Sequence, residues 1–163
     1  MRVRLTDEEA GEVSELRTSS TAFLGGEALA FHPTLVAVQK RASAFSGGLP
    51  WTHAECLQLV SYTSGQRFAT HVDYFEHLDG QTERNGGQRL FSGLVYLNDG
   101  SDGSDGSNGG EFEGGATTFP TLNLTFVPKK GTMLFWRNVD QQMAPGAVVC
   151  QIEAPFYARF GLS

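Results

Sequence analysis

The chain has 163 residues and a formal net charge of −6, with 40% apolar and 18% charged residues. This length suits a single domain with its own hydrophobic core, and the negative charge argues against non-specific binding to nucleic acid. No apolar run is long enough to span a membrane, and the N-terminus lacks the apolar segment of a signal peptide, so the cytoplasm is the default expectation.

The first predicted element is a helix over residues 33–45. Pro33 suits the first helical position, and apolar residues recur at helical spacing from Leu35 to Phe45, which predicts one apolar face. The glycines and the proline of residues 46–50 then end the helix.

Short strands are predicted for most of the remaining chain. They are separated by stretches rich in glycine and aspartate, a pattern typical of an antiparallel sandwich or jelly roll. The predicted strands lie within residues 55–62, 89–97, 122–126, 132–136 and 154–160.

Residues 98–115 contain three DGS repeats and almost no apolar side chains. Such a segment cannot bury enough surface to order itself, which predicts a mobile loop. Asp99, Asp102 and Asp105 recur every third residue and raise calcium binding as an alternative. An EF-hand loop places its ligands at every second position and closes with a glutamate, so the spacing disfavours calcium.

The triplet His71-Val72-Asp73 is the first candidate site. In a strand, residues two apart project to the same side, so we expect His71 and Asp73 to lie together while Val72 faces a core. An imidazole and a carboxylate so placed can form two corners of the 2-His-1-carboxylate triad that binds Fe(II). A hydrogen-bonded pair on a solvated face is the alternative for the triplet taken alone.

Five motifs in order give the triplet a context, and they span about residues 17–138. Together they resemble the prolyl 4-hydroxylase-like branch of the 2-oxoglutarate- and Fe(II)-dependent oxygenases, although Ala116 stands where that family usually has glutamate. The motifs are RTSSTAFL (17–24), ECLQLVSYTSGQRFATHVDYF (55–75), QRLFSGLVYLND (88–99), GGATTFP (114–120) and VPKKGTMLFW (127–136).

The resemblance implies a mainly β protein with an N-terminal helix, whose core is a double-stranded β-helix of the jelly-roll type. We leave open whether that fold is complete at both ends. Within one domain, we expect residues 1–54 to form an N-terminal helical support segment and residues 55–163 to form the oxygenase-like core.

The resemblance also implies a function. His71 and Asp73 would hold Fe(II), and 2-oxoglutarate and O₂ would be consumed, with ascorbate as reductant, to hydroxylate a substrate such as a peptidyl proline. Tyr62 stands where the family has a tyrosine lining the cosubstrate pocket, and a core aromatic residue is its alternative role. Members of the family often reside in the endoplasmic reticulum.

The end of the chain departs from the family pattern. The family needs a distal histidine as third iron ligand and a lysine that pairs with the far carboxylate of 2-oxoglutarate. No histidine follows His77, which is poorly placed as a ligand, and alignment puts Ala144 and Ala154 at the two functional positions. Arg159 is the candidate replacement for the lysine, with a solvent-facing strand charge as its alternative.

Three residues could replace the distal histidine as iron ligand: Cys150, Gln151 and Glu153. If none does, the chain is a degenerate or truncated homologue without catalysis, acting as a binding module with the same fold. A lectin-like jelly roll without iron ancestry would explain the strands but not the motif set.

Overall fold

The computed structural model describes residues 17–25, 31–84, 86–101, 112–140, 150–153 and 157–162. Its α-helices are α2 (Pro33–Ser43) and α3 (Gly80–Arg84), and its 3₁₀ turns are η1 (Trp51–His53) and η2 (Pro120–Leu122). Its strands are β1 (Ser20–Leu24), β2 (Leu57–Ser61), β3 (Arg67–His71), β4 (Phe91–Tyr96), β5 (Gly100–Ser101), β6 (Phe112–Glu113), β7 (Thr117–Phe119), β8 (Leu124–Phe126), β9 (Met133–Arg137), β10 (Cys150–Glu153) and β11 (Tyr157–Leu162).

Two antiparallel sheets form the body of the molecule. The major sheet has the order β1-β2-β11-β4-β9 and the minor sheet has the order β3-β10-β7-β8. Consecutive strands therefore alternate between the two sheets in places, as in β2 to β3 and β3 to β4, which is the connectivity of a jelly roll. The predicted fold class is confirmed. Strands β10 and β11 supply one strand to each sheet, so the last part of the chain takes part in both.

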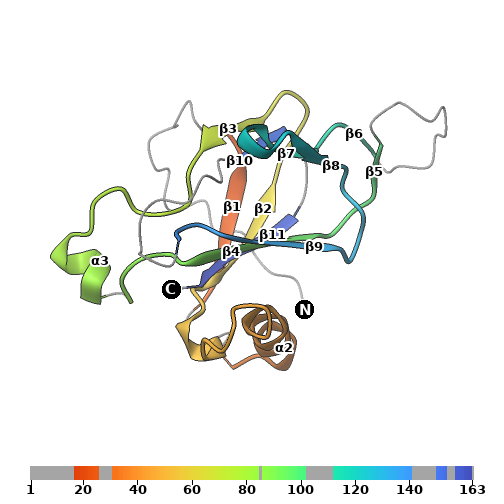
Figure 1. Cartoon of the computed structure of the whole chain (residues 1–163). Coiled ribbons are helices and arrows are strands. Elements are labelled where there is room, and N and C mark those ends of the chain that lie inside the picture. The colour runs from red at the N-terminus through yellow and green to blue at the C-terminus, as the bar shows by residue number, and fades with distance from the viewer. Residues whose placement is uncertain are drawn as a thin grey trace.

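The major sheet has a different hydrophobic layer on each of its faces. The inner layer lies between the two sheets, and the outer layer lies between the major sheet and α2, which Figure 1 shows on the side away from the minor sheet. Side chains of the inner layer are Val60, Tyr62, Phe68, Leu94, Tyr96, Phe119, Leu134 and Trp136. Those of the outer layer are Leu24, Leu35, Val38, Ala42, Ala54, Leu57, Phe91, Val95, Met133 and Phe135.

The predicted helix is confirmed as α2. Pro33 occupies its first turn after His32, whose backbone is extended with φ of −62° and ψ of 125°. The apolar stripe packs as its spacing predicts, because Leu35, Val38 and Ala42 all belong to the outer layer.

The five predicted strand segments correspond to β2, β4, β8, β9 and β11. The expectation of a loop over residues 98–115 is wrong at both of its ends, because β5 and β6 pair in parallel there. Asp102 and Asp105 lie outside the described residues, whereas the Asp99 carboxylate accepts a hydrogen bond from the Lys130 backbone N–H at 2.9 Å. None of the helices in the described ranges combines the length and apolar character that crossing a bilayer requires.

A candidate metal site at the end of β3

His71 and Asp73 lie side by side at the end of β3. His71 is the last residue of β3, and Asp73 follows in a bend rather than within the strand that the sequence pattern suggested. The His71 Nε2 atom lies 3.2 Å from Asp73 Oδ1, and the two side chains are only 6% and 2% exposed. The structure therefore brings the two predicted ligands together and shields them from solvent, unlike a pair on a solvated face.

A β-bulge in β3 sets the direction of His71. In the pairing with β10, Phe68 is opposite Ile152 and His71 is opposite Cys150, so two residues of β3 face the single residue Gln151. Strict alternation would place positions 68 and 71 on opposite faces. The extra residue reverses this, as bulges do when they redirect a side chain. His71 can therefore join Phe68 in the inner layer.

The ring of Phe68 supports the imidazole of His71 directly. The two rings stack with centroids 3.5 Å apart and planes 13° from parallel. The guanidinium carbon of Arg17 lies 4.9 Å from the centroid of the same Phe68 ring. Phe68 is itself only 8% exposed, so packing of the core fixes the plane of the imidazole.

The hydrogen bonding of His71 suits a metal ligand. Its Nδ1 atom lies 2.7 Å from the Ala69 carbonyl oxygen, which can only accept, so Nδ1 carries a proton. In the neutral imidazole this leaves a lone pair on Nε2, which faces the Asp73 carboxylate. A lone pair and a carboxylate repel one another, so this contact is attractive only when a proton or a metal ion lies between the two atoms.

The spacing also fits one metal ion. Two ligand atoms, each about 2.1 Å from an ion and at right angles to one another, lie about 3 Å apart, close to the observed 3.2 Å. The chemistry of one imidazole nitrogen and one carboxylate oxygen suits Fe(II). Among the side chains that the structure describes, no third histidine, cysteine, aspartate or glutamate completes a group of three.

Arg89 holds the backbone of Asp73 in place. Its Nη1 donates a hydrogen bond to the Asp73 carbonyl oxygen at 2.9 Å, while Nε and Nη2 donate to the two carboxylate oxygens of Glu55 at 2.7 and 2.9 Å. The neighbouring Gln88 side chain accepts from the Phe75 N–H at 2.7 Å and donates to the Phe75 carbonyl oxygen at 2.9 Å. These polar contacts fix the bend that carries the carboxylate.

Sequence reasoning did not identify these supporting residues. Arg89 and Gln88 fall within a motif of the family resemblance, yet nothing in their local pattern shows that they reach back across 16 and 13 residues. The one local indication of such a role is that Arg89 directly precedes an apolar strand, because a charged side chain next to a hydrophobic core needs a polar partner.

The structure gives fewer contacts for the other predicted site residues, which are Tyr62, Arg159 and His77. Tyr62 is 3% exposed in the inner layer. Arg159 is opposite Gln58 and Leu94 in the register of β11, which puts it on the inner face of the major sheet, although its side chain is not described. His77 lies in a bend beyond β3.

For the remaining candidate residues, the structure describes either the backbone alone or nothing. The positions Ala144 and Ala154 lie outside the described residues. Cys150, Gln151 and Glu153 are described as backbone in β10, without their side chains.

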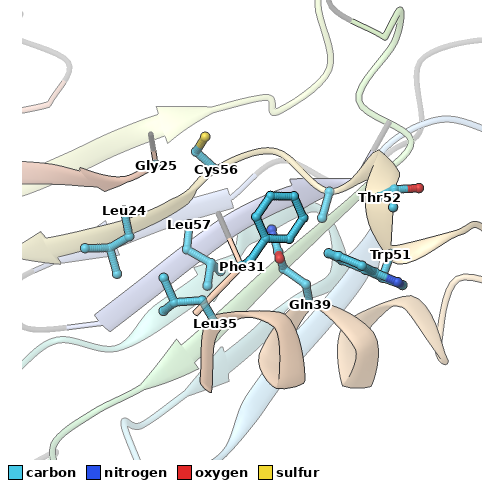
Figure 2. Close-up of a pocket in the computed structure, with 10 residues that line it drawn as sticks. Leu24, Gly25, Phe31, Leu35, Gln39, Trp51, Thr52, Cys56 and Leu57 are labelled. Carbon is cyan, nitrogen blue, oxygen red and sulfur yellow. The ribbon is translucent and has the colours of Figure 1, made fainter. Parts of the chain in front are cut away.

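A separate pocket of about 270 Å³ lies on the outer side of the major sheet. Figure 2 shows its wall of Leu35 and Gln39 from α2, with Trp51 and Phe31 beside them and the Cys56 thiol at a distance from α2. None of the residues that line it contributes to the His71 and Asp73 pair. This pocket therefore belongs to the outer layer and is distinct from the candidate metal site.

Comparison with known proteins places these observations in a family. Residues 57–159 match the model of the 2OG-Fe(II) oxygenase superfamily. Probable prolyl 4-hydroxylase 10 of Arabidopsis thaliana is 38% identical over 128 residues, covering 76% of this chain and 38% of that protein. Prolyl 4-hydroxylase 5 of the same plant is 33% identical over 168 residues, covering 88% of this chain and 52% of that protein. The chain thus spans between about two fifths and about half of the length of these relatives.

A solved structure shares the fold. The viral collagen prolyl hydroxylase of Paramecium bursaria Chlorella virus-1, solved in complex with 2OG, superposes with a TM-score of 0.63 at 22% sequence identity. The match covers 90% of this chain and 78% of the viral chain.

Proposed function

This chain belongs to the 2OG-Fe(II) oxygenase superfamily, and we propose that it is a dioxygenase of the peptidyl-proline 4-hydroxylase type. Family membership implies Fe(II) and 2-oxoglutarate as cofactor and cosubstrate. Dioxygen is the proposed second cosubstrate, ascorbate the proposed reductant, and a peptide or protein the proposed substrate. The names of the relatives, which are prolyl 4-hydroxylases, support proline as the target residue.

One observation carries the proposal: the Nε2 atom of His71 lies 3.2 Å from Oδ1 of Asp73, and both side chains are almost fully buried. His71 and Asp73 are the proposed iron ligands. Bound Fe(II), together with 2-oxoglutarate and dioxygen, supplies the oxidising chemistry that hydroxylates a C–H bond. The hydrogen bond from Nδ1 to the Ala69 carbonyl makes Nε2 the ring atom that faces Asp73, and the hydrogen bond from Arg89 holds the backbone of Asp73 in place.

Tyr62 and Arg159 are the proposed contacts for 2-oxoglutarate. Both belong to the inner face of the major sheet, Tyr62 by its burial and Arg159 by its register. A guanidinium can bind a carboxylate through two parallel hydrogen bonds, which makes Arg159 a chemically suitable substitute for the lysine of the family.

We also propose a single domain in which residues 1–54 support a core formed by residues 55–163. Two observations support this division of roles. Strand β1 pairs with β2 of the core, and α2 packs in the outer layer against the major sheet.

Anaerobic Fe(II) titration with and without 2-oxoglutarate tests the proposal. The wild-type chain should take up iron, and His71→Ala should weaken binding at least about 100-fold, because loss of a supporting contact already costs about 10–100-fold. His77→Ala is the matched control and should bind as the wild type does. Succinate release should then accompany hydroxylation of a proline-containing peptide. Absence of iron uptake by the wild type would refute the proposal.

A non-catalytic binding module is the second candidate function, and the absence of any histidine after His77 favours it. It predicts weak iron binding, no decarboxylation of 2-oxoglutarate, and stronger binding in Ala144→His. Succinate release that disappears in His71→Ala would contradict it.

A further inference from the structure

The pocket on the outer side of the major sheet, called the outer pocket below, is large enough to hold a small organic molecule. Its volume is about 270 Å³. An apolar cavity of about 150 Å³ already binds benzene, so the outer pocket has room for two fused aromatic rings.

The walls of the outer pocket are mostly apolar and come from several elements. Leu24 ends β1, Leu57 begins β2, and Leu35 lies in the first turn of α2. Figure 2 shows these leucines on one side of the Phe31 ring and Trp51 on the other. Phe31 is 79% exposed and Trp51 is only partly buried, so a ligand that covers these rings removes apolar surface from water.

Two contacts hold the outer pocket in its shape without a ligand. The Gln39 amide of α2 donates a hydrogen bond to the Glu55 carbonyl oxygen at 3.3 Å, which ties the helix to the backbone that leads into β2. At the other end, Gly25 leaves room for the Cys56 thiol, because a Cβ atom at position 25 would lie 2.7 Å from the sulfur. A pocket that is already formed binds its ligand with a smaller loss of conformational entropy.

The charge beside the outer pocket is positive, although the chain as a whole carries −6. The Lys40 Nζ atom lies 5.5 Å from the centroid of the Trp51 ring, and Arg41 follows it on α2. Residues 31–54 contain no aspartate or glutamate, and within the part of the chain that the structure describes neither cation forms an ion pair. An anionic group on the ligand would therefore be attracted to this edge.

We propose that the outer pocket binds a small aromatic carboxylic acid, with its rings against the leucines and Trp51 and its carboxylate beside Lys40. This site is independent of the proposed function, because none of its lining residues belongs to the pair of His71 and Asp73.

Calorimetric titration of the full chain, without added metal, with 2-naphthoate and its neutral counterpart 2-naphthamide tests the proposal. The wild type should bind one naphthoate per chain, and more tightly than the amide. Lys40→Gln should weaken naphthoate binding about 2- to 5-fold, as expected for an exposed ion pair, and leave amide binding unchanged. Arg41→Gln is the matched control, because it removes the same charge one residue away, and it should bind both ligands as the wild type does.

Two further variants locate the bound acid. Trp51→Ala should bind both ligands about 10-fold more weakly, because an aromatic contact is lost. His71→Ala should bind naphthoate unchanged, which separates the outer pocket from a carboxylate site at the candidate metal centre.

A second measurement needs no variant. Cys56 is exposed and lines the outer pocket, so saturating naphthoate should slow alkylation of this thiol several-fold, followed by mass spectrometry. Absence of saturable naphthoate binding would overturn the inference, as would binding that neither protects Cys56 nor changes in Trp51→Ala. Equal affinity of the wild type for naphthoate and the amide would overturn the assignment of an acid.

Discussion

The two faces of the major sheet are both packed with apolar side chains, yet they differ in what else they bury. The polar residues that are buried in the described chain are Asp73, Ser92, Thr117 and Asn138. A hydrogen bond, an ion pair or the strand register links each of them to the inner layer. There the Asn138 amide donates hydrogen bonds to the Ser92 hydroxyl at 3.0 Å and to the Arg89 carbonyl at 3.1 Å. The outer layer, under α2, has no buried polar member among the described residues.

The buried polar groups give the inner layer a role beyond stability that the outer layer does not share. An apolar layer needs only volume and shape, whereas a buried polar group needs a partner and therefore a defined geometry. We infer that substitutions in the outer layer change the free energy of unfolding but not metal affinity, and that substitutions in the inner layer change both. The experiments below test this distinction with matched pairs of residues.

The largest expected effect comes from removing a core leucine on either face. Leu94 is 0% exposed in the inner layer and Leu57 is 3% exposed in the outer layer. Truncation of either to alanine should lower the free energy of unfolding by about 2–5 kcal/mol, measured by urea denaturation. Only Leu94→Ala should also weaken Fe(II) binding under conditions where the chain stays folded. Equal loss of affinity in Leu57→Ala would contradict the separation of the two layers.

An intermediate effect is expected at Arg89. Arg89→Lys keeps the charge but cannot make the paired contact with Glu55 while reaching the Asp73 carbonyl. The free energy of unfolding should fall by about 1.5–3 kcal/mol, as for hydrogen bonds to charged groups. The affinity for Fe(II) should fall about 10–100-fold, because the position of a ligand is disturbed.

Arg137 provides the matched control for Arg89. It lies over the ring of Phe91, at 5.7 Å from the ring centroid, and donates a hydrogen bond to the Asp140 carbonyl at 3.2 Å. Arg137→Lys should leave metal affinity unchanged. If it weakened affinity as much as Arg89→Lys does, the loss would follow from replacing any arginine with lysine and not from the contacts of Arg89 with Asp73 and Glu55.

The smallest expected effect on stability comes from two stacked aromatic pairs, one in each layer. Phe68 stacks on His71 at 3.5 Å, and Phe91 stacks on Phe135 at 5.3 Å, both between ring centroids. Replacing Phe68 or Phe91 with leucine should cost about 0.5–1.5 kcal/mol of stacking energy. Only Phe68→Leu should loosen the imidazole and weaken Fe(II) binding, which parallel titrations would show.

Much of the fold could be predicted because its signals are local. The spacing of Leu35, Val38 and Ala42 predicts the buried face of α2, and short apolar segments predict β2, β4, β8, β9 and β11. By contrast, β7 and β10 lie outside the predicted strand segments, although β8 is as short as β7. Strand β10 is defined by its pairing with β3 and β7, and pairing across such sequence separations leaves no signal in the local pattern of residues.

The candidate metal site, like the fold, could be predicted only in part. The identity and spacing of His71 and Asp73 point to a ligand pair, but the bulge that turns His71 toward the inner layer depends on pairing with residues about 80 positions later. From Phe68 alone, strict alternation would have turned His71 to the wrong face.

The position of β11 has a consequence for how the chain reaches its native state. Residues 157–162 follow every other strand of the described chain, yet they lie in the middle of the major sheet between β2 and β4. During synthesis, β2 and β4 leave the ribosome long before the strand that joins them. Closure of this sheet must therefore wait until translation has passed residue 162, and pairing at such sequence separations is slow. Until then, both strands expose unpaired edges that a chaperone can shield or a second nascent chain can capture.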